Sequence, residues 1–139
     1  MNKVFFDASV LFSAIYSPTG GSNIVCNLVK QEKITRFTTQ TVIRELEKNL
    51  LKFNKKTNTS IENFITDYKF IVRSEITERE IKPYKKYVEK KDAHVLAGAT
   101  LCKCGFLLTL DKKHINNRKI KEKFTKITIV SPKEFLEKY

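Results

Sequence analysis

The chain has 139 residues, and its 41% of hydrophobic residues can fill one core, so we expect a single domain over residues 1–139. Lysine and arginine number 27 against 15 acidic residues, and the resulting net charge of +12 lies mostly after residue 70. This charge favours a polyanionic partner, nucleic acid first and an anionic membrane surface second, although a lysine-rich surface can also serve solubility alone. No apolar stretch approaches the ~20 residues of a membrane-spanning helix, so we expect no membrane insertion.

The three cysteines, Cys26, Cys102 and Cys104, lack the paired spacing of a zinc site. We interpret them as small hydrophobic residues of a protein in a reducing compartment. The amino terminus has Lys3 ahead of an apolar run, as a signal peptide does, but Asp7 interrupts that run and no cleavage site follows. We therefore expect a cytoplasmic location.

In the first half of the chain, unbroken apolar runs alternate with helical spacing. The run KVFF predicts a buried strand that ends at Asp7, and the breakers Pro18 and Gly20 precede apolar residues at helical spacing. Thr39 or Thr41 can cap a later helix. The expected elements are a strand over residues 3–6, a helix over 22–29, a strand over 34–39, a helix over 42–53 and a helix that begins at Thr59.

The second half begins with an expected edge strand over residues 70–76, followed by a charged segment that breaks at Pro83 and forms exposed turns over 84–90. Over residues 92–102, small and apolar residues surround nearly the whole helical circumference, which predicts a helix buried on most sides. The expected order ends with a central strand over residues 105–110, a strand over 126–130 and a short helix capped by Ser131.

Strands that alternate with helices predict an α/β fold whose central, mostly parallel sheet lies between helical layers. Ligands of such sheets bind beyond the carboxyl ends of the strands, where Asp7 and Asp111 lie. Asp92 opens the buried helix, on the same expected edge. Glu45 and Glu47 flank opposite sides of the apolar face of the helix after the second strand, so periodicity does not choose between them.

Four motifs in sequence order resemble those of PIN-domain nucleases, over essentially the whole chain: FDASVL, VIRELEKNL, KKDAHVLAGA and LLTLDKKH. The resemblance implies a three-layer α/β sandwich that cleaves single-stranded or structured RNA with Mg²⁺ or Mn²⁺. It also implies that many small relatives are toxins held inactive by an antitoxin. By this resemblance, the catalytic and metal-binding acids are Asp7, Glu45, Asp92 and Asp111.

The chemistry of such a site explains why it is built from carboxylates. Mg²⁺ and Mn²⁺ prefer carboxylate and water oxygens, and one ion, or two about 4 Å apart, can activate a water and neutralise the departing oxygen. We assign Asp7 and Asp92 to direct coordination, and Glu45 and Asp111 to contacts through water. Singly, each acid has a simpler explanation as a helix cap, a solvated residue or a turn former.

Other residues near these acids have weaker assignments. Ser9 and Thr109 are similar to the small polar residues that the family places beside its acids. Asn116 stands near a position where many relatives carry a further acid or Asn. We interpret His114 as a surface residue of a basic loop and His94 as a buried or rim histidine.

Two basic segments are candidates for binding the RNA backbone, although each could be a solvated face. Residues 112–126 contain seven lysines or arginines against one glutamate, and residues 82–91 add two tyrosines on which unpaired bases could stack. The RNA-binding candidates are Lys112, Lys113, Arg118, Lys119, Tyr84 and Tyr87.

The function expected from the sequence is that of a metal-dependent endoribonuclease, the toxin of a toxin–antitoxin pair, with a homodimer as a plausible assembly. The alternatives are a housekeeping RNA-processing nuclease without an antitoxin and a non-catalytic RNA-binding domain. The second alternative requires that the four acids do not assemble.

Overall fold

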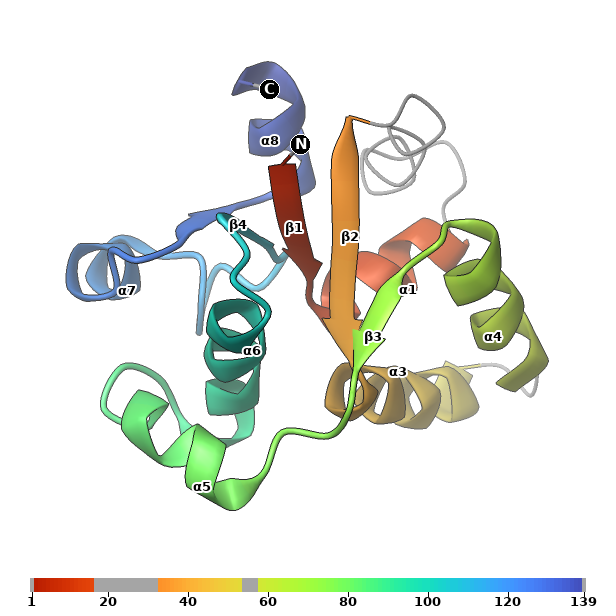
Figure 1. Ribbon diagram of the computed structural model, residues 1–139, viewed down its shortest axis with the longest axis horizontal. Helices are drawn as coiled ribbons and strands as arrows, with labels where there is room; N and C mark the ends of the chain where they lie inside the picture. Colours follow the sequence, from red (N-terminus) through yellow and green to blue (C-terminus); the bar gives the residue numbers. More distant parts are fainter. Residues whose placement is uncertain (1, 17–32, 54–57, 139) are drawn as a thin grey trace.

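The computed structural model describes residues 2–16, 33–53 and 58–138. Within these ranges, five strands form one parallel sheet in the order β3-β2-β1-β4-β5, with β3 at one edge (Figure 1). The strands are β1 (Asn2–Phe6), β2 (Ile34–Thr39), β3 (Ile71–Arg73), β4 (Phe106–Leu108) and β5 (Thr128–Val130). All five predicted strands are confirmed, although most are shorter than expected. The middle strand is β1, and β4 lies next to it.

The helices include four that the sequence predicts, namely α3, α4, α6 and α8. The predicted helix over residues 22–29, together with Cys26, lies outside the described residues. No helix in the described part of the chain is both long and apolar enough to cross a membrane. The helices are α1 (Ala8–Tyr16), α3 (Gln40–Phe53), α4 (Asn58–Asp67), α5 (Glu78–Ile81), the 3-10 helix η2 (Lys82–Tyr84), α6 (Lys90–Leu101), α7 (Arg118–Lys123) and α8 (Pro132–Lys138).

Three of these helices, α1, α5 and α7, were not expected from the sequence. Helix α1 begins directly after Asp7, whose carbonyl accepts the amides of Val10 and Leu11 at 3.1 and 3.2 Å. Its sequence has no charged residue and only two serines among mostly apolar residues, so the helical period is weak. The short helices α5 and α7 are rich in charge, and caps rather than apolar stripes mark where they begin: Thr77 for α5 and Asn117 for α7.

Capping threonine and serine residues fix two other helices. The Thr39 hydroxyl accepts the amide of Val42 at 3.1 Å and so caps α3, whereas the Thr41 hydroxyl accepts the amide of Ile76, which precedes α5, at 2.9 Å. The expected Ser131 cap of α8 is confirmed, because its hydroxyl accepts the amide of Glu134 at 3.1 Å. The side chain of Thr59 lies outside the described residues.

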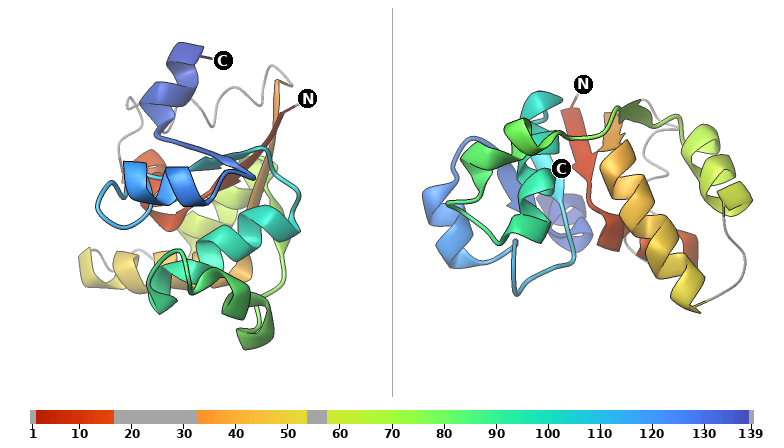
Figure 2. Two further views of the ribbon diagram at one scale, coloured as in Figure 1. Left: turned by 90° about the vertical axis from the view of Figure 1, so that its left-hand side faces the viewer. Right: turned by 90° about the horizontal axis from the view of Figure 1, so that it is seen from below.

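The sheet is covered on both faces, which confirms the predicted three-layer α/β fold. On one face, Phe5 of β1 lies against α6. On the other face, the ring of Phe6 meets Phe70 at 5.0 Å between centroids, and Phe106 of β4 meets Phe135 of α8 at 5.2 Å. Seen from below in Figure 2, α6 and α3 lie on either side of the end of β1.

The two cysteines in the described residues are free thiols. Cys104 is buried, and burial raises the pKa of its thiol to about 12, while Cys102 is half-buried. At neutral pH the Cys104 thiol therefore stays protonated and packs as a small hydrophobic group, as expected.

Helix α6 lies so close to the sheet that only glycine fits at residue 98. A Cβ added there would be 2.8 Å from the tip of the Phe5 ring and 3.0 Å from the methyl group of Thr39, and both side chains are fully buried. The contact fixes how α6, which begins two residues before Asp92, is placed over β1 and β2.

We predict that Gly98→Ala lowers the free energy of unfolding by about 1–3 kcal/mol, because the overlap outweighs the roughly 1 kcal/mol that alanine contributes to a helix. Urea unfolding followed by circular dichroism measures the change. Gly105→Ala is the control, since a Cβ at this exposed position meets nothing within 4 Å. Equal unfolding midpoints for the two variants would contradict the proposed close fit.

Candidate active site

Asp7 lies at the carboxyl end of the central strand, where β1 passes directly into α1. The residue is 5% exposed, and its carboxylate accepts three hydrogen bonds. Oδ1 accepts the amide of Ala8 at 2.7 Å, and Oδ2 accepts the hydroxyls of Thr109 at 2.7 Å and Ser9 at 3.2 Å. Ser9 and Thr109 therefore lie beside this acid, in the position that the sequence analysis expected.

Burial makes the negative charge of Asp7 unfavourable. Burial and, to a smaller extent, the negative charge of Glu45 together raise the pKa of this carboxyl to about 6, against the opposing effects of the Thr109 hydroxyl and the Ala8 amide. Three neutral donors thus do not compensate the buried charge in full. A cation placed against the carboxylate would do so.

Asp92, Asp111 and His114 form a second part of the same site. One ligand atom from each lies within 4.8 Å of the others. Asp111 follows β4, and its two carboxylate oxygens accept the amide of His114 at 3.0 Å and contact the His114 Nδ1 at 3.1 Å. The Thr109 hydroxyl accepts the amide of Asp111 at 3.1 Å while donating to Asp7, so one side chain connects the two acids.

Asp92 lies in the first turn of α6. One of its carboxylate oxygens, Oδ2, is buried and has no hydrogen-bond partner among the described residues. Burial raises the pKa of this carboxyl, and the negative charge of Asp111 raises it further. Two acids at this separation repel each other unless a cation lies between them.

Glu45 reaches the site from α3 and is the most exposed of the four predicted acids, at 46% of its side chain. Its Oε2 lies 3.2 Å from Nε2 of His94, which is buried on α6. The charge of Glu45 acts on both Asp7 and Asp92, raising the pKa of each. Glu45 thus faces the same edge of the sheet, although it is outside the close group formed by Asp92, Asp111 and His114.

The donor set fits a hard divalent cation. Carboxylate oxygens dominate it, the buried Asp92 Oδ2 lacks a partner among the described residues, and the pKa values of two carboxyls are raised because like charges gather out of water. In Figure 1, the arrowheads of β1 and β2 point to the edge of the sheet from which α1 and α3 depart. This is the edge where α/β sheets bind ligands.

The remaining predicted residues have varied surroundings. The Asn116 amide donates to Oε1 of Glu134 at 3.1 Å rather than to an acid of the site. Lys112, Lys113, Arg118 and Lys119 are exposed, and Arg118 pairs with Glu122 at 2.9 Å. Tyr84 and Tyr87 are half-buried, and both rings pack against Phe124, at 6.1 and 5.2 Å between centroids.

Sequence reasoning missed one member of the cluster, His114. The side chain is partly exposed, at 28%, as a loop residue would be, but it also contacts Asp111, which the sequence analysis did not predict. The available signal was its position three residues after Asp111, where a side chain can turn back to that carboxylate. His94, in contrast, is buried as the sequence predicted, but it is not fully satisfied as expected, because its buried Nδ1 has no hydrogen-bond partner among the described residues.

The comparisons with known proteins agree with this geometry. The family model of the PIN domain matches residues 3–113, and the chain therefore belongs to the PIN domain family. No curated protein matches the sequence.

Solved structures share the fold at low sequence identity. A chain of VapBC2 from Rickettsia felis, crystallised with a promoter DNA fragment, is 15% identical with a TM-score of 0.64, covering 93% of this chain and 98% of that one. PAE2754 from Pyrobaculum aerophilum is 17% identical with a TM-score of 0.58, covering 97% and 92%. VapC20 from Mycobacterium tuberculosis, described as a toxin that cleaves the sarcin–ricin loop, is 12% identical with a TM-score of 0.57, covering 79% and 91%.

The raised pKa of Asp7 predicts how stability depends on pH in the absence of divalent ions. Between the pKa of 3.8 that an aspartate has in an unfolded chain and the folded value of about 6, the folded protein holds a proton that the unfolded chain has released. The Asp7 contribution to stability therefore falls as pH rises through this window and is constant above it. We predict that Asp7→Asn gains nothing at pH 3 but becomes about 3 kcal/mol more stable than the native protein at pH 7.5.

Urea unfolding in EDTA at several pH values between 3 and 7.5 measures this difference. Asp67→Asn, at an exposed position on α4, is the matched control for replacing an aspartate. A stability difference between Asp7→Asn and the native protein that does not change with pH would contradict the prediction.

Proposed function

We propose that this protein is a divalent-metal-dependent endoribonuclease and the toxin of a toxin–antitoxin pair. The observation that carries the proposal is the gathering of Asp92, Asp111 and His114, with ligand atoms within 4.8 Å of one another, beside the buried Asp7. A non-catalytic RNA-binding domain would have no reason to collect a buried acid and partly buried acids at one sheet edge, because their repulsion lowers stability.

In the proposed mechanism, Asp7 and Asp92 would hold the ion, Mg²⁺ or Mn²⁺, and Glu45 and Asp111 would contact it through water or orient the attacking water. When bound, the ion supplies an activated water and a positive charge for the phosphate. Thr109 and Ser9 keep the Asp7 carboxylate oriented by donating to Oδ2. His114 fixes the rotamer of Asp111 through its amide and ring contacts.

The substrate and the partner are inferred from the surface and from the relatives. A net charge of +12 favours a nucleic acid substrate. VapC20 is described as a toxin that cleaves the sarcin–ricin loop, and VapBC2 was crystallised with promoter DNA. By analogy, we infer RNA as the substrate, a protein antitoxin as the partner and a cytoplasmic location.

We predict that the purified protein cuts single-stranded RNA with Mn²⁺ or Mg²⁺ and that EDTA abolishes cleavage. Asp92→Asn should lower the rate by at least roughly 100-fold, since changes to groups that only support metal ligands already cost 10–100-fold. Gel analysis of a labelled RNA measures cleavage, and circular dichroism confirms that the variant is folded.

Asp67→Asn should cleave RNA at the native rate, because it is the same chemical change at an exposed position on α4. Full activity in Asp92→Asn, or undiminished cleavage in EDTA, would refute the metal-dependent mechanism.

The toxin assignment predicts that expression of the native gene arrests bacterial growth and that co-expression of a small neighbouring gene relieves the arrest. Asp7→Asn should not arrest growth, although we expect it to fold and to be at least as stable as the native protein. Harmless expression of an enzyme that is active in vitro would favour a housekeeping role in RNA processing.

A further inference from the structure

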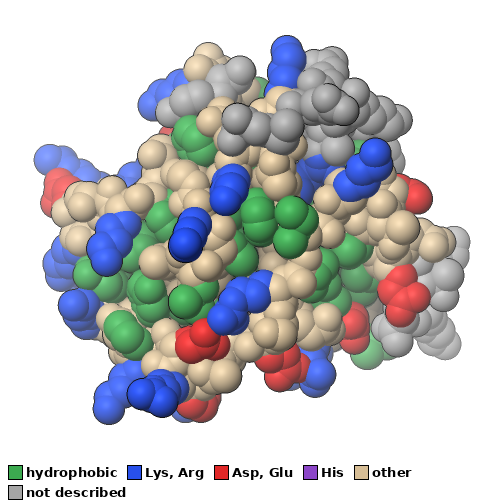
Figure 3. Space-filling model, in the orientation of Figure 1, with side chains coloured by type: hydrophobic (Ala, Val, Ile, Leu, Met, Phe, Trp, Pro, Cys, Tyr) green, Lys and Arg blue, Asp and Glu red, His purple; other side chains and the backbone are tan. Residues whose placement is uncertain are grey.

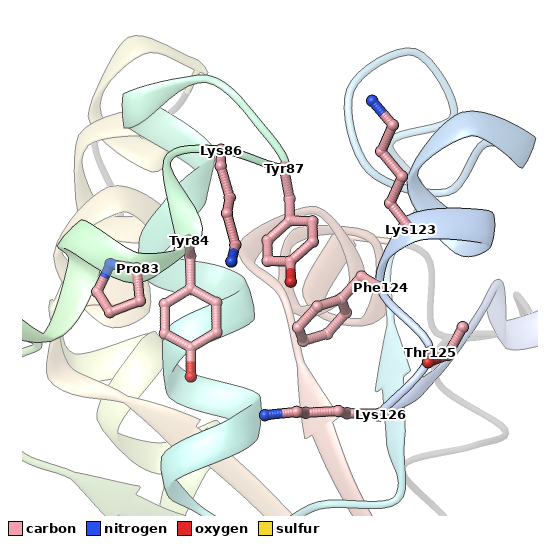
Figure 4. Close-up of a pocket in the computed structure, with 8 residues that line it drawn as sticks. All are labelled: Pro83, Tyr84, Lys86, Tyr87, Lys123, Phe124, Thr125 and Lys126. Carbon is pink, nitrogen blue, oxygen red and sulfur yellow. The ribbon is translucent and has the colours of Figure 1, made fainter.

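A hollow of about 190 Å³ opens between η2 with the residues that follow it and the end of α7 (Figure 4). It contains no residue of the acidic site. We call it the aromatic pocket, and its lining residues are Pro83, Tyr84, Lys86, Tyr87, Lys123, Phe124, Thr125 and Lys126.

The aromatic wall of this pocket is held in place by ring packing. Tyr84 and Tyr87 each meet Phe124 edge to face, with interplanar angles of 73° and 65°. Phe124 is only 3% exposed, so it anchors both tyrosines to the core. Because the rings are already ordered, a ligand that stacks on them pays little for their immobilisation.

Two ammonium groups face the same space. Figure 4 shows the amino group of Lys86 between the rings of Tyr84 and Tyr87 and that of Lys126 directed toward Tyr84 below Phe124, whereas Lys123 points away. Lys86 Nζ lies 5.2 Å from the centroid of the Tyr87 ring. No carboxylate in the described part of the chain forms a salt bridge with Lys86 or Lys126. Their charges are thus available to an anion.

A second hollow, of about 390 Å³, lies beside the aromatic pocket on the side of His114. It shares Lys86 and Tyr87 with the pocket and extends to His114, which contacts Asp111. Across the two linings there are six lysines and a single acid, Glu89. Lysine and arginine side chains are also prominent on the α5 and α7 side of the face in Figure 3. A basic path therefore leads from the acids to the aromatic pocket.

We propose that the aromatic pocket binds one unpaired nucleotide of the RNA strand. This nucleotide belongs to the same RNA strand as the phosphodiester bond at the acidic site and lies further along it. The base lies against the rings of Tyr84 and Tyr87, which Phe124 supports from the core, and the adjoining phosphates contact Lys86 and Lys126. A volume of about 190 Å³ is below the ~300–1,000 Å³ typical of pockets for whole drug-sized ligands, which suits a single base. The identity of the polyanion rests on the proposed function, while the pocket itself does not.

The test measures RNA binding without cleavage. A fluorescent single-stranded RNA of about ten nucleotides is titrated with protein in EDTA, and anisotropy gives the dissociation constant. Tyr84→Leu and Tyr87→Leu keep an apolar contact with Phe124 but remove the stacking face, and each should weaken binding about tenfold. Lys126→Gln should make the negative slope of log affinity against log salt concentration shallower by about 0.7, which corresponds to the loss of one phosphate contact.

Two matched variants control for general effects of these changes. Tyr16→Leu replaces an exposed tyrosine at the end of α1, and Lys52→Gln an exposed lysine at the end of α3. Both should bind RNA with native affinity and native salt dependence. A duplex of the same sequence should bind the native protein more weakly than the single strand, because paired bases cannot enter the pocket.

The outcomes separate this inference from the proposed function. If the pocket variants bind as the native protein does, or if the native protein binds no RNA in EDTA, the pocket assignment is wrong whatever the enzyme cleaves. If the native protein fails to cleave RNA with Mn²⁺ but the pocket variants lose affinity, the nuclease proposal fails and the pocket assignment stands.

A second measurement uses only the native protein and does not depend on how the variants fold. RNA that contains 4-thiouridine is cross-linked to the native protein in EDTA by near-ultraviolet light, and mass spectrometry locates the modified peptides. Cross-links in residues 82–87 or 123–126 support the assignment. Cross-links confined to other segments overturn it.

Discussion

The burial of one charge, that of Asp7, is the constraint on which the rest of the site depends. Asp7 ends the middle strand of the sheet, where neighbours on both sides exclude water, and only hydroxyl and amide donors meet its oxygens among the described residues. Those donors orient the carboxylate but leave its pKa raised to about 6. A neutral residue at this position would make the fold more stable than a charged one does. We therefore infer that the charge serves binding rather than folding.

The same residues serve the fold and the site. Thr109 joins Asp7 to the backbone of Asp111, and Ser9 accepts the amide of Leu110 while donating to Asp7, so the ends of β1 and β4 are fixed to each other. Gly98 lets α6 approach the sheet closely, and this contact helps to position Asp92, in the first turn of α6, relative to the other acids. The spacing of the acids therefore depends on core packing, and a change in that packing would change the distances between the acids.

Hydrophobic patterning predicted the strands and the larger helices, because burial on a sheet face or a helix stripe leaves a period in the sequence. It failed for α1, where a mostly apolar, uncharged sequence gives only a weak helical period, and for α5 and α7, where short length and high charge erase the period. In the site, strand ends located Asp7 and Asp111, but the choice of Glu45 over Glu47 needed the family resemblance. The contact of His114 with Asp111 was not predicted, because it depends on a loop conformation that no periodicity encodes.

The signs of the charges explain why acids and lysines occupy adjacent surfaces. A phosphodiester approaching the acidic site meets like charge, and the lysines that line the neighbouring hollows can hold the strand but cannot remove the repulsion at the point of reaction. In the proposed mechanism, a divalent ion would reduce this repulsion, because its two positive charges offset part of the negative charge of the carboxylates and attract the phosphate directly. In the proposed mechanism, binding and chemistry are separate tasks: the basic path would supply affinity along the strand, and the acids would act only once the ion is in place. On this proposal, RNA binding in EDTA and cleavage with metal are independent properties of the same surface.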